Sequence, residues 1–444
     1  MYLTEKLTYR KIFVFWGPLA LTWLMMAFEQ PVLIAFIARL ADAKVNLAAF
    51  GIAGSFAMIF EAPIIMLMSA STALVTGHHS YRKLKRFTDL LNLGVTAVQL
   101  LMLIPPVFKF IVVRLMGVPA EVAGLAHIAL LIFLPWAASI GYRRFYQGIL
   151  IRNNLTRRVT YGTMVRLSVI VITGVILYSA GVKGAYVGAA AMSLAVFSEA
   201  VATRIMAAST VKLLVNKEDT ENGHLNLRSI SRFYYPLAIT SLLSLGVHPF
   251  VTFFLGRSDM AVESLAVLPV VNSLVFVFRS LGLSYQEVNI ALIGKQRQNF
   301  MLLRNYAIIL GVIVTVFITL IAFTPLADLW FMKISGLSKE LADLSYLPLQ
   351  IMVLLPALTV LLNFQRSLLV IQGTTGPISV ATAVELTGII GVLLVCVVFL
   401  DMVGVVGASL AFVIGKGMST LYLMPRQKAL IKGWRHSQQK RISS

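Results

Sequence analysis

Residues 389–400 read IIGVLLVCVVFL and carry no charged side chain. Similar apolar runs recur along the 444-residue chain, for example at 64–75, 95–104 and 167–177. Hydrophobic residues make up 58% of the chain and charged residues only 13%, which is too little polar material to cover a water-facing surface. Most runs extend to about 20 residues, the length that a helix needs to cross the hydrocarbon core. The sequence therefore predicts an all-α integral membrane protein of about twelve transmembrane helices.

The N-terminal segment and the cysteine content exclude two simple alternatives. Residues 9–40 form an apolar segment that is too long for a signal peptide and contains Glu29 and Arg39, so we expect a retained membrane helix. The single cysteine, Cys396, allows neither an intramolecular disulfide nor a thiolate metal cluster. We expect no metal and no cofactor, apart from a coupling ion, H⁺ or Na⁺.

The basic residues set the predicted orientation. The formal net charge of the chain is +20. The basic residues gather in alternate loops and not on one face, which argues against a nucleic-acid partner. By the positive-inside rule both termini are cytoplasmic. We therefore place the chain in a bacterial-type inner membrane or a plasma membrane. The basic segments are the N-terminus, 82–86, 152–158, 212–232, 295–304 and 426–441.

One hydrophilic stretch, from Lys217 to His224, divides the chain. We predict an N-terminal six-helix bundle over 1–213, a cytoplasmic linker over 214–230, a C-terminal six-helix bundle over 231–432 and a basic cytoplasmic tail over 433–444. The predicted spans are 11–40, 46–77, 87–115, 122–150, 159–181, 186–213, 231–257, 264–294, 302–332, 340–372, 376–400 and 404–430.

The two halves resemble each other. At an offset of 218, PLALT at 18–22 aligns with PLAIT at 236–240, Pro31 with Pro249, and Arg39 with Arg257. Coincidence among apolar residues is the alternative, but matched proline spacing and helix-end arginines favour a duplication. Two halves of six helices start on the same side of the membrane, so the repeats are parallel and the substrate is expected between them. The prolines predict a kink in the first helix of each half.

Ionisable residues at membrane depth are the candidate site residues, because a charge there costs at least about 2.5–3.5 kcal/mol. Glu29 is a candidate protonation or cation site, although a neutral, hydrogen-bonded carboxyl would also fit. His248, which precedes a proline, could titrate near neutral pH or could only pack. The candidates for substrate binding or ion coupling are Glu29, Gln30, Glu61, His248, Arg279 and Glu287.

A second set of candidates forms a predicted charge network between the halves. In the repeat alignment Glu61 corresponds to Arg279, and Arg166 to Glu385, so equivalent positions carry opposite charges. Such residues could form ion pairs that gate a central cavity. The alternative is a fixed pair that only orients the bundles. Arg166, Glu385, Arg366 and Gln147 make up this set.

Several motifs resemble the multidrug and toxic compound extrusion (MATE) proteins of the MOP flippase superfamily. They are the PLALT helix ending at Ala38-Arg39-Leu40, the segment FYQGILIR at 145–152 and the segment VKGAYVGA at 182–189. Phe28-Glu29-Gln30 looks closer to the progressive ankylosis branch. The resemblance implies two six-helix bundles that expose a central cavity to alternate sides, driven by proton or sodium exchange. Many drug-extrusion members have an acidic residue where this chain has Leu33, so their cation site does not transfer directly.

These observations favour a secondary active exporter of an organic solute, with the membrane arginines tilting the expectation towards an anion. The alternative is a flippase of lipid-linked oligosaccharide or lipid pyrophosphate. A membrane-embedded enzyme is a more remote alternative, because only His78-His79 hints at a catalytic set and no known catalytic motif accompanies it. We expect membrane lipids and a small organic solute as partners, and a monomer.

Overall fold

The structure is a computed structural model that describes residues 7–153, 155–217, 226–293, 299–372, 374 and 376–442. These residues form helices and no β-strand, so the predicted all-α class is confirmed. Eleven helices are long and apolar enough to cross a membrane, or twelve if the bent pair His78–Leu103 and Pro105–Leu115 is one span. The predicted twelve spans agree with the upper count. Residues 218–225 of the predicted linker lie outside the described part of the chain.

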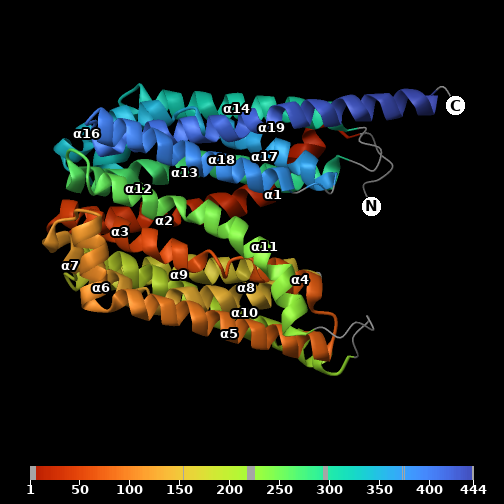
Figure 1. Ribbon diagram of the computed structural model, residues 1–444, viewed down its shortest axis with the longest axis horizontal. Coiled ribbons are helices and arrows are strands. Elements are labelled where there is room, and N and C mark those ends of the chain that lie inside the picture. The colour runs from red at the N-terminus through yellow and green to blue at the C-terminus, as the bar shows by residue number, and fades with distance from the viewer. Residues whose placement is uncertain are drawn as a thin grey trace. The chain divides into compact units, whose positions relative to one another are not determined.

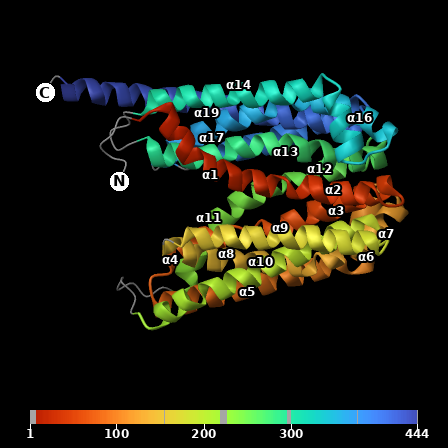
Figure 2. The ribbon, with the colours of Figure 1, turned by 180° about the vertical axis from the view of Figure 1, so that it is seen from behind.

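The chain divides into two compact units. Unit 1 contains residues 1–31, 270–334 and 338–444, and unit 2 contains residues 32–269 and 335–337. In both views of the ribbon, α5, α8, α9 and α10 of unit 2 lie lengthwise beside one another, with α6 and α7 at the end opposite α4 (Figures 1 and 2). In unit 1, α13, α14, α17 and α19 run side by side in the same way (Figures 1 and 2).

The helices of unit 2 have the following bounds: α3 Ala43–Glu61, α4 Leu67–Leu74, α5 His78–Leu103, α6 Pro105–Lys109, the π-helix η1 Phe110–Leu115, α7 Ala120–Ile132, α8 Leu134–Arg152, α9 Thr156–Ser179, α10 Gly184–Val215, α11 Leu227–Leu245 and α12 Val247–Leu255. Those of unit 1 are α1 Tyr9–Ala27, α14 Phe300–Ala322, α15 Leu326–Asp328, η2 Leu329–Ile334, α16 Lys339–Met352, α17 Leu355–Ile371, α18 Gly376–Leu393, η3 Leu394–Phe399 and α19 Gly404–Ile442. Helices α2 Glu29–Ala38 and α13 Ala261–Leu292 contribute residues to both units.

The first span of each half is broken beside its proline, as predicted. Helix α1 ends at Ala27 and α2 restarts at Glu29, two residues before Pro31. Helix α11 ends at Leu245 and α12 restarts at Val247, two residues before Pro249. A proline removes a backbone N–H and crowds the preceding turn, which explains why the helix does not continue straight through.

The backbone repeats itself at the offset found in the sequence. The π-helices η1 and η2 begin 219 residues apart, at Phe110 and Leu329. Gly117 and Gly336, also 219 residues apart, have φ angles of 75° and 78°. A glycine is favoured in this left-handed region because it has no Cβ. Rare conformations recurring at one offset support the duplication more strongly than matches among apolar residues do.

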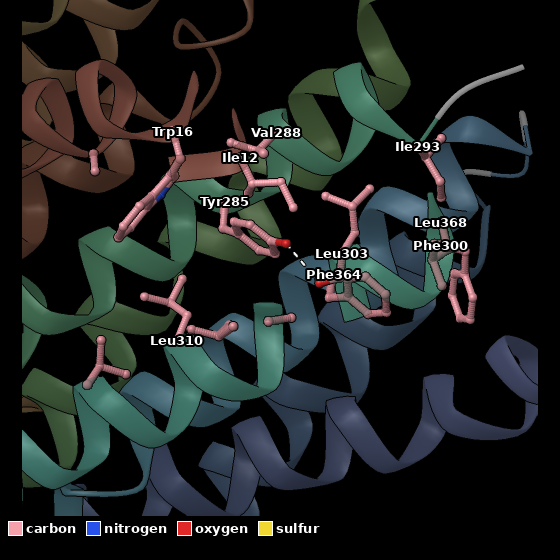
Figure 3. Packing of buried hydrophobic residues seen from close by; sticks show 14 residues of the cluster. Ile12, Trp16, Tyr285, Val288, Ile293, Phe300, Leu303, Leu310, Phe364 and Leu368 are labelled. Atoms are coloured by element: carbon pink, nitrogen blue, oxygen red, sulfur yellow. Dashed lines mark hydrogen bonds between the residues drawn. The ribbon is translucent and has the colours of Figure 1, made fainter. Parts of the chain in front are cut away.

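The interior of unit 1 joins the N-terminal helix to helices from the other half of the sequence. Ile12 and Trp16 of α1 pack in a buried cluster with residues of α13, α14 and α17 (Figure 3). The Trp16 indole Nε1 donates a hydrogen bond to Ser284 Oγ at 2.8 Å. The hydroxyl of Tyr285 donates to the Leu303 carbonyl at 2.8 Å (Figure 3). Both bonds satisfy buried donors, so the aromatic side chains can remain in the apolar core.

Candidate functional site

The first candidate site lies where α8, α9 and α10 meet. Arg143 Nη1 lies 2.5 Å from Glu199 Oε2, and Arg166 Nη1 lies 3.4 Å from the same oxygen. Gln147 Nε2 donates to Glu199 Oε1 at 3.2 Å. The three charged side chains are 5%, 9% and 1% exposed, in the order Arg143, Arg166 and Glu199. We call Arg143, Gln147, Arg166 and Glu199 the N-half cluster.

Small residues let the helices approach closely enough to build this cluster. A Cβ on Gly141 would lie 2.0 Å from Asn92 Oδ1 of α5, and one on Gly148 would lie 2.5 Å from the Met68 carbonyl of α4. On α9, a Cβ on Gly162 would come within 3.4 Å of Glu199 Cγ. Glycines at helix contacts are typical of membrane bundles, where close packing replaces the hydrophobic effect. They fix α8 and α9 so that their polar side chains meet Glu199.

The second candidate site uses the equivalent helices of unit 1. Lys416 Nζ of α19 lies 2.5 Å from Glu385 Oε1 of α18. Arg366 Nη2 of α17 lies 3.9 Å from Glu385 Oε2 and 3.3 Å from Thr382 Oγ1. Gly415 again permits the approach, because its Cβ would lie 2.9 Å from the Glu385 carbonyl. We call Arg366, Glu385 and Lys416 the C-half cluster.

The two clusters are built on equivalent helices but differ in which helix carries the carboxylate. At the offset of 219, Gln147 corresponds to Arg366 and Arg166 to Glu385. The carboxylate thus lies on the third helix of the trio in unit 2 and on the second helix in unit 1. In both cases one carboxylate lies between two cations. Both clusters therefore carry one positive charge that no carboxylate within them offsets.

In the structure, the residues of the predicted charge network contact partners within their own unit. Arg166 and Gln147 both contact Glu199, and Glu385 contacts Arg366 and Lys416. The predicted pairs Glu61–Arg279 and Arg166–Glu385 would join residues of different units, and they stay predictions.

The predicted coupling candidates have different surroundings. Glu29 is 3% exposed and lies in the first turn of α2, beside the break in the first span. Gln30 and His248 are half-buried, and Glu61 is the last residue of α3. Glu287 is an exposed residue of α13. Neither cluster contains any of these residues, and their roles stay predictions.

Two guanidiniums have weaker partners. Arg144 Nη1 donates to Met68 Sδ at 3.7 Å, and Arg279 Nε donates to Thr359 Oγ1 at 3.2 Å. No carboxylate of the described chain lies within ion-pair distance of either side chain. Arg279 is among the candidates for substrate binding or ion coupling that the sequence predicts.

Sequence reasoning missed one residue of the C-half cluster. Lys416 was not singled out, although it lies in the predicted span 404–430 between Gly415 and Gly417. The rule that selected Arg366 and Glu385, a charge within an apolar span, would have found it.

The chain is similar in sequence or in fold to several known proteins. Residues 18–176 match the family model MatE, and no curated protein matches the chain. An inward-facing multidrug resistance MATE transporter of the MOP superfamily is 16% identical, covers 94% of this chain and 99% of its own, and has a TM-score of 0.72. The lipid II flippase MurJ, in an inward closed conformation, is 17% identical, covers 94% and 87%, and has a TM-score of 0.72.

A third similar structure is a MOP superfamily transporter from Pyrococcus furiosus, described as having a binding pocket of reverse polarity. It is 16% identical, covers 97% of this chain and 100% of its own, and has a TM-score of 0.63. The resemblance seen in the sequence is thus confirmed for the fold. The closer likeness to the ankylosis branch stays a prediction.

Proposed function

We propose, from the premise that this chain has the MATE transporter fold and matches the MatE model over residues 18–176, that it exports an organic anion by alternating access. H⁺ or Na⁺ would move in the opposite direction. The observation that carries the proposal is the excess of cations over carboxylates among these buried and half-buried side chains. Each cluster holds one carboxylate between two cations, and Arg144 and Arg279 add guanidiniums beside neutral partners.

An anionic substrate follows from the cost of that excess. An uncompensated charge within a membrane protein costs several kcal/mol, so it normally faces a counter-charge or a water-filled cavity. A carboxylate or phosphate on the substrate would supply the missing negative charge, and guanidiniums bind such groups through paired hydrogen bonds.

Glu29 is the residue that we propose for ion coupling. It is buried at a proline-associated break between two helices, where backbone groups are not all paired within one helix. A carboxyl at such a place can take up a proton or bind a cation as its surroundings change. Glu29→Gln would then uncouple transport from the ion gradient and leave exchange of substrate for substrate.

Flux measurements in liposomes test the proposed function. The purified protein is reconstituted with imposed H⁺ or Na⁺ gradients, and uptake is compared for labelled dicarboxylates, phosphate monoesters, and the cations ethidium and tetraphenylphosphonium. Gradient-dependent uptake of an anion, reduced by Arg144→Gln and Arg279→Gln, is expected. The matched control is Lys44→Gln, which removes a half-buried cation that is already paired with Glu263. Uptake of cations alone would overturn the anionic preference, and gradient-independent flux at channel rates would overturn alternating access.

A lipid flippase is the second candidate, because MurJ matches the chain with the same TM-score as the drug transporter. Both candidates use cations that bind a phosphate or carboxylate. The substrate of a flippase would carry a lipid tail. Movement of a fluorescent polyprenyl pyrophosphate between leaflets, without uptake of any soluble anion, would favour this candidate.

The fold and the apolar spans establish an integral membrane protein, and we propose that both termini are cytoplasmic. The basic loops at alternate turns support this orientation. Cysteines placed at the N-terminus and at the turn near Asp42, in a Cys396→Ala background, should react with an impermeant thiol reagent from opposite sides of the membrane.

A further inference from the structure

A cavity of about 460 Å³ is lined by residues of α6, η1 and α7. Helices α6 and α7 lie at the end of unit 2 opposite α4 (Figure 1). The cavity contains neither charge cluster. Its walls come from a segment in which the chain bends by 72° after α5. The bend follows from the sequence Ile104-Pro105-Pro106, because two consecutive prolines supply no N–H groups to the preceding turn.

His127 holds the bent segment against α7. Its Nε2 lies 2.7 Å from the Leu103 carbonyl, and since a carbonyl only accepts, Nε2 carries the proton in this bond. The imidazole also packs against Phe108, with ring centroids 4.7 Å apart. One side chain thus satisfies a carbonyl next to the helix break and fixes an aromatic wall of the cavity.

The cavity combines an apolar interior with a cationic rim. Ala120, Ala123 and Gly124 lie on the face of α7 that lines it, and a Cβ on Gly124 would meet nothing within 4 Å. Lys109 and Arg114 lie at the edge, each in the last turn of its helix, and both are exposed. Neither forms a hydrogen bond or an ion pair with the described part of the chain. Two cations without carboxylate partners therefore flank an open apolar slot.

The repeat provides an internal comparison at the equivalent place in unit 1. At the offset of 219, Asp328 replaces Lys109, Asp343 replaces Gly124 and Tyr346 replaces His127. The Tyr346 hydroxyl donates to Asp328, and the tyrosine ring packs on Phe331 with centroids 5.9 Å apart. In unit 1 acidic side chains thus replace Lys109 and Gly124, and a direct bridge joins the two helices, whereas Lys333 keeps the positive charge of Arg114. The combination of an open glycine slot with two cations therefore occurs in the N-terminal half and does not follow from the repeated fold alone.

We propose that this cavity binds a membrane phospholipid with an anionic headgroup. The phosphate lies between Lys109 and Arg114, and an acyl chain lies along Gly124 and Phe108. The apolar lining and the position at one end of the membrane spans favour a lipid over a soluble anion. Basic residues at the membrane surface attract anionic headgroups, and long cationic side chains reach them easily. This inference does not depend on what the protein transports.

Lipid binding to the purified full-length protein in detergent tests the proposal. Native mass spectrometry compares phosphatidylglycerol with phosphatidylcholine of the same acyl chains. We expect the anionic lipid to bind more tightly. Neutralising Lys109 or Arg114 by glutamine should weaken its binding by about five-fold each, the usual effect of one basic residue at an anionic surface. Gly124→Leu should weaken binding of both lipids because it fills the slot.

Controls separate the slot from general charge effects. Lys333→Gln, at the position equivalent to Arg114, should leave lipid binding unchanged, and the exposed positions of Lys109 and Arg114 allow their variants to fold. Equal binding of the two lipids, or a loss of binding as large in Lys333→Gln as in Arg114→Gln, would overturn the proposal. So would competition by glycerol phosphate alone at the concentration of the lipid.

Discussion

Glu199→Gln tests how the N-half cluster is held together. The substitution keeps the shape of the side chain but removes the carboxylate that contacts both Arg143 and Arg166. Both buried guanidiniums then lose the carboxylate that lies between them. Removing one partner of a buried ion pair typically costs about 3–5 kcal/mol, because the remaining charge keeps its desolvation penalty. At roughly 2 °C per kcal/mol for a large domain, the apparent Tm should fall by roughly 6–10 °C.

The assay is thermal unfolding of the detergent-purified protein, with Glu263→Gln as the matched control. Glu263 pairs with Lys44 at 2.9 Å, but the two side chains are 20% and 39% exposed. A pair with that exposure contributes about 1 kcal/mol or less. The double variant Arg166→Gln with Glu199→Gln should lose less stability than the sum of the single variants, because the two side chains are coupled. Equal losses in Glu199→Gln and Glu263→Gln would refute the reasoning.

Three other substitutions test separate parts of the fold. Gly117→Ala should cost about 1–2 kcal/mol, measured by unfolding, because a side chain is strained at a φ of 75°; an unchanged Tm would contradict this. Glu385→Gln should destabilise unit 1 by about 3–5 kcal/mol, because Lys416, whose side chain is only 12% exposed, loses its contact with a carboxylate, and the further change Lys416→Met should restore part of the loss. Ser284→Ala should cost about 1–3 kcal/mol by leaving the Trp16 indole N–H unpaired, and Trp16 fluorescence should report the change.

The membrane-spanning helices were predictable from the sequence because each depends on the total hydropathy of about 20 consecutive residues and not on any single contact. A span needs only enough apolar residues in a row, and the prolines at 31 and 249 marked the breaks that the structure shows. The bend after Leu103 was not predicted, and residues 87–115 were taken as one span. Pro105 and Pro106 carried the signal, but hydropathy alone does not distinguish a helix that crosses from one that turns.

The candidate site was predictable as a set of residues but not as a set of contacts. Arg166 and Glu385 were selected because charges within a membrane are costly, and both belong to the clusters. Their partners, Glu199 and Lys416, each lie on the next α-helix of the chain, and the rotation of each helix decides which side chains meet. Glycine contacts such as those of Gly162 and Gly415 set that rotation, and they depend on the packed structure.

Counterflow is the measurement that tests the central claim, alternating access to an organic anion, most directly. Liposomes containing the protein are loaded with an unlabelled anion, chosen because the uptake assay shows that the protein transports it. They are then diluted into a trace of the labelled form, without any ion gradient. An alternating-access transporter should accumulate the label inside transiently, above its external concentration. Unlabelled anion carried outwards leaves the binding site open to the outside, where it binds the labelled form and carries it in. Arg279→Gln should reduce this overshoot. Simple equilibration of the label without an overshoot would contradict the account.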